Sequence, residues 1–171
     1  CHAAATILQR AGVKSGDRVA FLGLNSNVCF ESYYSPAILG ATLVPINYRL
    51  ALREMVECVQ DCVPTVLIVD ENYLTEARQL QEGCDSVKTL IACGDNTAPD
   101  GMLSYEQHIN EVIRTNVYCE ISPSVDDETV IIFYTGGTTG RSKGVMLSNN
   151  NFQCNTLCSI PLYRMQQHWT F

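Results

Sequence analysis

The chain has 171 residues, of which 46% are hydrophobic and 17% charged, and its formal net charge is -7 at pH 7. This length and composition exclude a disordered chain and fit one globular unit that buries a core. The acidic balance argues against nucleic acid as a main partner, and no apolar run reaches the roughly 18 to 20 residues of a transmembrane segment.

Strand-like and helix-like segments alternate along the first part of the chain. Residues 1–10 already have helical spacing, so we expect the natural start to lie upstream. Ser104, followed three residues later by Gln107, predicts the start of a further helix. The predicted strands are 18–24, 42–46, 65–69 and 88–92. The predicted helices are one that Asn25 or Ser26 caps and that runs to about Leu39 with a kink at Pro36, and those over 52–62 and 71–82. This alternation predicts an α/β fold with a largely parallel sheet and flanking helices.

The second part of the chain begins with a segment that contains one proline and two serines, 121–127, which predicts a linker. The apolar runs 129–134 and 144–148 then predict two adjacent strands around a glycine-rich loop. Residues 149–159 predict a helix after the second strand. The loop is therefore expected to be held at both ends by regular structure.

The glycine-rich loop, residues 134–145, reads Y-T-G-G-T-T-G-R-S-K-G-V and contains no acidic residue. Glycines let a backbone turn through positive φ and approach a ligand closely, so that free N–H groups can bind an anion. Thr135, Thr138 and Thr139 add hydroxyl donors, and Lys143 adds a charge. An ammonium about 4 Å from a phosphate contributes about 4 kcal/mol at a dielectric near 20, whereas a carboxylate about 20 Å away contributes roughly 0.2 kcal/mol in water. The acidic chain can therefore still bind ATP through this loop.

Two other interpretations of the loop are weaker. A Walker-type NTPase needs Gly-Lys-Ser/Thr opening a helix, but here Lys143 is followed by Gly144 and a strand-like segment. A glycine-rich hairpin without a ligand needs only ordinary turn signals. That alternative does not account for the combined spacing of glycines, threonines and lysine.

The loop resembles the phosphate-binding signature Y-T-[S/G]-G-T-T-G-x-x-K-G of the AMP-forming, adenylate-forming enzyme superfamily, which includes the acyl-CoA synthetases. Two upstream segments are similar to the same family: 12–20, G-V-K-S-G-D-R-V-A, and 34–50, Y-S-P-A-I-L-G-A-T-L-V-P-I-N-Y-R-L. Together with the loop, the resemblance covers most of residues 3–152. I-N-Y-R-L at the end of the second segment is most like a fatty or aryl acyl-CoA ligase. Ser142 and Asn149 depart from the family pattern, which usually has proline or alanine and then histidine.

The resemblance implies that residues 1–171 are an incomplete portion of the large N-terminal AMP-binding domain, with the C-terminal domain outside the chain. It implies ATP, Mg²⁺ and coenzyme A as cofactors, with a carboxylic acid, foremost a fatty acid, as substrate. Thr138 and Lys143 would be catalytic, and no metal ligand is expected in this chain. The cofactor-binding residues would be Thr135, Gly136, Gly137, Thr138, Thr139, Gly140 and Lys143.

Several features bear on the state of the chain itself. Nine cysteines at irregular spacings, without C-x-x-C, predict free thiols rather than a zinc site or a disulfide framework.

We take the cytoplasm as the default compartment, and an organelle or a membrane-peripheral location stays open. Tyr33 and Tyr34 are interpreted as packing residues of a helix. The alternative to an enzyme segment is a non-catalytic module that binds nucleotide weakly or binds a protein partner, and unpaired strand edges predict self-association.

Overall fold

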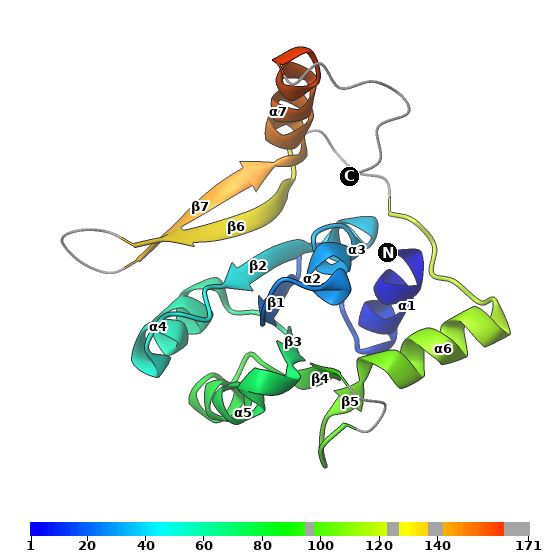
Figure 1. The fold of residues 1–171 in the computed structure, drawn as a ribbon, viewed down its shortest axis with the longest axis vertical. Helices are drawn as coiled ribbons and strands as arrows, with labels where there is room; N and C mark the ends of the chain where they lie inside the picture. The colour runs from blue at the N-terminus through cyan, green and yellow to red at the C-terminus, as the bar shows by residue number, and fades with distance from the viewer. Residues whose placement is uncertain (95–97, 123–126, 137–141, 163–171) are drawn as a thin grey trace.

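A computed structural model of the chain describes residues 1–94, 98–122, 127–136 and 142–162. A single sheet has the strand order β5-β4-β3-β1-β2-β6-β7. All neighbouring strands are parallel except β6 and β7, which are antiparallel. The strands are β1 (Arg18–Leu22), β2 (Thr42–Ile46), β3 (Val66–Asp70), β4 (Thr89–Cys93), β5 (Leu103–Ser104), β6 (Thr129–Thr135) and β7 (Lys143–Ser148). The predicted α/β fold with a largely parallel sheet is confirmed (Figure 1).

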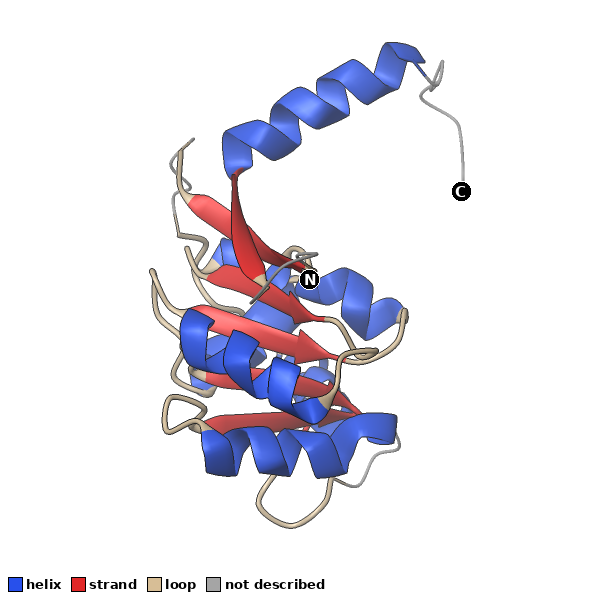
Figure 2. Cartoon of the chain, turned by 90° about the vertical axis from the view of Figure 1, so that its left-hand side faces the viewer, coloured by secondary structure: helices blue, strands red, loops and turns tan. Residues whose placement is uncertain are grey.

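Helices cover both faces of the parallel strands (Figure 2). One face carries α1 (His2–Arg10), α2 (Asn27–Ser32), α3 (Ser35–Ile38) and α6 (Tyr105–Thr115). The other face carries α4 (Leu52–Cys62) and α5 (Leu74–Gly83), the latter preceded by a short 3₁₀ turn, Glu71–Tyr73. A last helix, α7 (Asn149–Leu162), follows β7. None of the helices in the described part of the chain has the length and apolar content that a membrane crossing requires.

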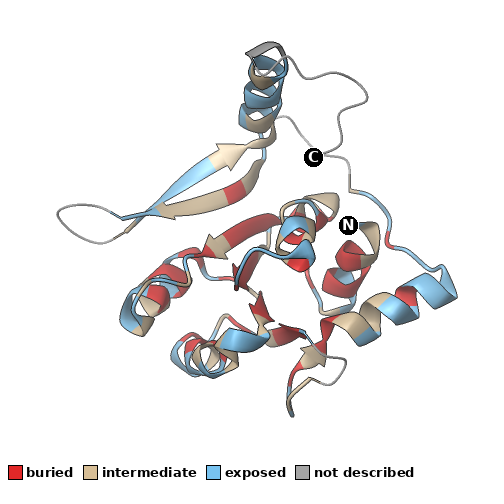
Figure 3. Ribbon diagram, viewed as in Figure 1, coloured by how far each residue is buried: buried red, intermediate tan, exposed pale blue. Residues whose placement is uncertain are grey.

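The core consists of two apolar clusters separated by the sheet. In β1, Val19 and Phe21 belong to the cluster under α1, whereas Ala20 and Leu22 belong to the cluster under α4. Successive side chains of a strand point to opposite faces, so a strand buried on both faces needs an unbroken apolar run. Figure 3 shows this buried centre in the parallel strands.

The predicted helix over 25–39 is wrong as a single kinked element, because the chain forms α2 and α3 instead. The Ser26 hydroxyl caps α2 by accepting a hydrogen bond from the Cys29 amide at 3.1 Å. Pro36 then lies in the first turn of α3. Proline lacks the amide hydrogen that a helix interior needs and is tolerated in a first turn, where that donor has no intrahelical partner. The segment therefore ends one helix and begins another.

Other boundaries differ by smaller amounts. The predicted strand 18–24 ends at Leu22, where its pairing with both β2 and β3 stops. The predicted helix 71–82 begins as the 3₁₀ turn, and Gly83 is its last residue rather than a residue beyond it. β5 has two residues, too few for any alternation, and was missed.

The β6–β7 hairpin is joined to the parallel sheet near its base. The register pairs Leu43 of β2 with Ile131 of β6, and the Thr42 hydroxyl donates to the Thr129 carbonyl at 2.8 Å. The hairpin then projects past β2, with the loop at its far end and α7 at its base (Figure 1). In the predicted linker 121–127, residues 123–126 lie outside the described part.

Candidate functional site

The two ends of the glycine-rich loop are held side by side by the β6–β7 hairpin. Thr135 pairs with Lys143, and Tyr134 pairs with Gly144. The Thr135 hydroxyl also donates to the Lys143 carbonyl at 3.4 Å. Directly opposed residues of an antiparallel pair project to the same face of the sheet. The Thr135 hydroxyl and the Lys143 ammonium therefore share one face of the hairpin, and Tyr134 lies on the other.

Both residues that border the loop on this face are open to solvent. Thr135, Gly136 and Lys143 are exposed. None of the described acidic side chains forms an ion pair with Lys143. An ammonium without a carboxylate partner among the described residues is suited to an anionic ligand.

The centre of the predicted site falls outside the described residues. Gly137, Thr138, Thr139 and Gly140 belong to this segment, so their proposed contacts stay predictions. Of the residues that the sequence assigned to phosphate binding, the structure therefore brings together Thr135, Gly136 and Lys143.

The two described glycines at the loop do not use the conformational freedom that the sequence predicted for them. Neither Gly136 nor Gly144 has a φ in the left-handed region. A Cβ on Gly144 would lie 2.9 Å from the Ile132 Cγ2 and 3.4 Å from the Tyr134 Cζ, so glycine is needed there to make room for neighbouring side chains. A Cβ on Gly136 would meet no described atom within 4 Å. Packing, not positive φ, thus explains Gly144.

Tyr134, on the opposite face from Thr135, connects the loop end to α4. Its hydroxyl donates a hydrogen bond of 2.5 Å to the Asp61 carboxylate in the last turn of that helix. Burial, and then the hydrogen bond to Asp61, raises the pKa of Tyr134, so the phenol stays a neutral donor. Sequence reasoning missed Asp61. Its one local signal is an acidic residue in the last turn of a helix, where the helix dipole disfavours negative charge.

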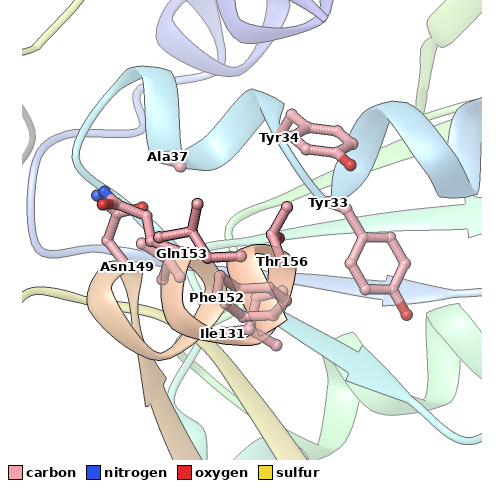
Figure 4. Close-up of a pocket in the computed structure, with 10 residues that line it drawn as sticks. Tyr33, Tyr34, Ala37, Ile131, Asn149, Phe152, Gln153 and Thr156 are labelled. Atoms are coloured by element: carbon pink, nitrogen blue, oxygen red, sulfur yellow. The ribbon is translucent and has the colours of Figure 1, made fainter. Parts of the chain in front are cut away.

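A pocket of about 420 Å³ lies on the face of β6 opposite Tyr134 and α4, against the N-terminal half of α7. Its size falls in the range of small-molecule sites. Figure 4 shows side chains from α7, β6 and the α2–α3 region converging on it. The lining residues are Tyr33, Tyr34, Ala37, Val130, Ile131, Asn149, Phe152, Gln153, Thr156 and Leu157.

The pocket and the loop lie at opposite ends of β6. Val130 lines the pocket, whereas Thr135 begins the loop, and five residues of strand span roughly 16 Å. A carboxylate inside the pocket would therefore be far from a phosphate held at the loop ends. Tyr33 packs near Phe133, with ring centroids 6.4 Å apart, which agrees with the packing role predicted for it.

The cysteines are free thiols, and five of the nine are buried. Burial, with a smaller effect of Cys58, raises the pKa of Cys62 to about 12, so this thiol is protonated at neutral pH. A protonated buried thiol is neither a nucleophile nor a metal ligand. Across residues 1–94, 98–122, 127–136 and 142–162, no three His, Cys, Asp or Glu side chains are grouped to hold a metal ion.

Known proteins resemble this chain along nearly its whole length. The family model described as "AMP-binding enzyme" matches residues 1–170. An indoleacetate–CoA ligase of Aromatoleum aromaticum is 33% identical and matches 94% of this chain and 31% of its own length. A 2-succinylbenzoate–CoA ligase of Arabidopsis thaliana is 29% identical and matches 91% of this chain and 28% of its own length.

Solved structures share the fold. A structure described as a putative long-chain-fatty-acid CoA ligase from Rhodopseudomonas palustris aligns with a TM-score of 0.82 at 25% identity, over 97% of this chain and 40% of that one. ATP-bound MatB from the same organism aligns with a TM-score of 0.78 at 26% identity, over 95% of this chain and 31% of that one. The chain thus spans about three tenths of the length of the curated relatives named above.

Proposed function

Because this chain belongs to the AMP-binding enzyme family, among the adenylate-forming acyl-CoA ligases, we propose that an enzyme containing it activates a carboxylic acid with ATP. The carboxylate oxygen attacks the α-phosphorus, and the bond from this phosphorus to the oxygen that bridges to the β-phosphate breaks. Acyl-adenylate and pyrophosphate form. The thiol of coenzyme A then attacks the acyl carbon, giving the thioester and releasing AMP. Residues 1–171 would be part of the AMP-binding domain of that enzyme.

In this proposal the glycine-rich loop binds the β- and γ-phosphates while they become pyrophosphate. Lys143 contributes positive charge, and Thr135 contributes a hydroxyl at the entrance of the loop. Gly136, Gly137, Thr138, Thr139 and Gly140 would complete the site with amides and hydroxyls. Such a transfer depends mainly on positioning and on stabilising charge that develops in the transition state.

The observation that carries the proposal is the cross-strand pair of Thr135 and Lys143. It places a hydroxyl and an ammonium on one face at the two ends of the loop, and no described carboxylate neutralises the ammonium. Mg²⁺ would enter bound to the nucleotide. The described residues hold no suitable group of ligands, so we assign it no ligand here.

The acid itself is proposed from the sequence and from the names of relatives. I-N-Y-R-L at 46–50 supports a fatty or aryl acid, and we propose a fatty acid as the first substrate to test. The relatives named above act, by their names, on indoleacetate and 2-succinylbenzoate, and a structural neighbour is described as a long-chain-fatty-acid ligase. Indoleacetate is therefore the aromatic acid to compare with it.

The test is carboxylate-dependent ATP–pyrophosphate exchange by the intact enzyme that contains this chain. Lys143→Ala should raise the free-energy barrier to adenylate formation by about 2 to 4 kcal/mol. Removal of one hydrogen-bond donor that stabilises the transition state has an effect of this size in other enzymes. That change slows exchange by roughly 30- to 900-fold. Lys14→Ala, which removes an exposed charge between α1 and β1, is the matched control and should leave exchange unchanged. Exchange at the wild-type rate in Lys143→Ala would contradict the proposal.

A second proposal concerns the 171-residue chain by itself, as a non-catalytic module that associates with other chains. Its support is β7, an edge strand on which Val145 is 43% and Met146 64% exposed. An apolar edge strand offers unpaired backbone groups to a second chain. Light scattering should detect oligomers of the isolated chain, and exchange should be undetectable. A monodisperse monomer would exclude this association.

A further inference from the structure

We propose that Asp61 is a positioning residue for the phosphate-binding loop. It accepts the hydrogen bond of the Tyr134 hydroxyl and so holds the incoming end of the loop against the last turn of α4. Asp61 would not touch the nucleotide, because it lies on the face of the hairpin away from Thr135 and Lys143. This inference rests on the proposed function.

The first argument is the attachment of the hairpin. Its register with β2 is at Ile131, and its hydrogen bond to the Thr42 hydroxyl is at Thr129. Tyr134 lies roughly 10 Å further along the strand. The hydrogen bond to Asp61 ties the loop end of β6, beyond Ile132, to an element other than its partner strand β7. Without it, the loop end would depend on its pairing with β7 and on packing.

The second argument is that the neighbouring residues accommodate this contact. The Tyr134 ring packs against the apolar cluster under α4. Gly144, directly across from it, leaves the space that a Cβ would take from Ile132 and the ring. A larger residue than glycine would clash with Ile132, beside the ring, and would leave the ring no spare room on that side.

The third argument is electrostatic. Asp61 lies in the last turn of α4, a turn with no basic residue of its own, although the Arg18 guanidinium of β1 donates to the Cys62 and Val63 carbonyls at that helix end. Carbonyl oxygens at the end of a helix carry partial negative charge, so a carboxylate there is unfavourable without a hydrogen-bond donor. The Tyr134 hydroxyl is such a donor, and a hydrogen bond to an ionised acceptor is stronger than one between neutral groups. The Tyr134 hydroxyl thus stabilises the Asp61 carboxylate, and the carboxylate gives the phenol a hydrogen-bond acceptor.

The consequence for catalysis follows from the order of residues along the strand. Thr135 comes directly after Tyr134 and pairs with Lys143. Fixing Tyr134 on one face of the hairpin therefore fixes the position of both groups on the other face. Displacing reacting groups by about 1 Å can cost up to about 100-fold in rate, and side chains that hold a binding group in place are part of the site in this sense.

The experiment measures ATP–pyrophosphate exchange in the intact enzyme for three variants. Tyr134→Phe removes the hydroxyl and keeps the ring, and Asp61→Ala removes the acceptor. Each should raise KM for MgATP and lower kcat/KM by about 10-fold, within the range of a small misplacement. Asp61→Asn keeps an acceptor oxygen and should stay within about three-fold of the wild type.

Two further readouts separate positioning from a general loss of structure. The double variant Asp61→Ala, Tyr134→Phe should lose no more than either single variant, because both remove the same interaction. The KM for the acid and the denaturation midpoint should change little. Tyr118→Phe and Asp85→Asn are the matched controls, since each removes a phenol or a carboxylate away from the hairpin, and both should behave as the wild type.

Three results would overturn the inference. Wild-type KM for MgATP in Tyr134→Phe and Asp61→Ala, while Lys143→Ala loses exchange, would reject the role of Asp61 and leave the proposed function standing. Additive losses in the double variant would show that the two residues act independently. Absence of carboxylate-dependent exchange in the wild-type enzyme would reject the proposed function, and this inference with it.

Discussion

The strands at the centre of the sheet and the strands that carry the loop belong to the same sheet but are supported very differently. In β1, four of five residues are buried, between α1 on one face and α4 on the other. In β7, no residue is buried, although its centre is apolar. Figure 3 shows the same contrast between the buried parallel strands and the hairpin, in which β6 is mostly of intermediate burial and β7 is largely exposed. Apolar sequence alone therefore does not make a strand part of the core.

This difference shows which contacts hold the candidate site in position. A strand covered on both faces is positioned by many contacts at once, whereas the loop end of the hairpin is positioned by few. Regions with few buried contacts open locally at low free-energy cost. The Tyr134–Asp61 hydrogen bond and the space at Gly144 consequently matter more here than similar contacts would in the core.

The largest test of the contrast is removal of an apolar side chain from the centre of the sheet and from α7, the helix that follows the hairpin. Leu67 of β3 is completely buried, whereas Leu157 of α7 is 67% exposed. Leu67→Ala should lower the free energy of unfolding by about 2 to 5 kcal/mol, because a cavity remains. Leu157→Ala should change it by less than about 0.5 kcal/mol. Denaturant unfolding measures both, and equal losses would break the contrast.

A second test uses the two glycines at the loop. Gly144→Ala forces a methyl group against Ile132 and the Tyr134 ring, and should cost about 1 to 3 kcal/mol of stability, as overpacking does. Gly136→Ala meets open space among the described atoms and should cost little. Urea denaturation of the two variants compares them directly. A neutral Gly144→Ala would mean that the hairpin yields more easily than its packing indicates.

A third test uses alkaline pH on a tyrosine from each region. Burial, and then the hydrogen bond to Glu31, raises the pKa of Tyr105 in α6, and burial together with Asp61 raises that of Tyr134. Below pH of about 10, the tyrosine is protonated in both the folded and the unfolded chain, and its contribution to stability is fully present. Above it, only the unfolded chain loses the proton, so stability falls as pH rises.

The slope above that pH should reach up to about 1.4 kcal/mol per pH unit for the buried Tyr105 and be smaller for the half-buried Tyr134. Tyr105→Phe and Tyr134→Phe should each flatten the profile, the first more than the second. Denaturation midpoints between pH 8 and 11.5, in roughly half-unit steps around the tyrosine pKa, give the comparison. A profile that neither variant flattens would contradict both assignments.

The smallest effect is expected from surface charge in the well-supported region. Arg53 and Glu57 form an ion pair of 3.4 Å along α4, but the Arg53 side chain is 90% exposed. Arg53→Ala should therefore change the free energy of unfolding by no more than about 0.5 kcal/mol. A larger loss in a urea titration would mean that charge, and not apolar burial alone, distinguishes the two regions.

Local patterns predicted most of the elements because their causes are local. The strand 42–46 and the helix 52–62 have the predicted bounds, since an unbroken apolar run and a 3.6-residue spacing are complete within each segment. Ser104 caps α6 as predicted, with the Gln107 amide donating to its hydroxyl at 3.3 Å. The helix around Pro36 was mispredicted because a proline can either kink a helix or begin a new one, and the local sequence fits both.

The sequence by itself determined the alternation of strands and helices, the family to which the loop belongs, and the residue types offered to an anion. Only the tertiary structure decided the strand order, the opposite placement of loop and pocket on β6, and the meeting of Tyr134 with Asp61. The physical reason is how far apart in the sequence the interacting residues lie. A cap, a turn or an apolar period is complete within a few residues, whereas a hydrogen bond between residues 73 positions apart exists only after the sheet and its helix layer have packed.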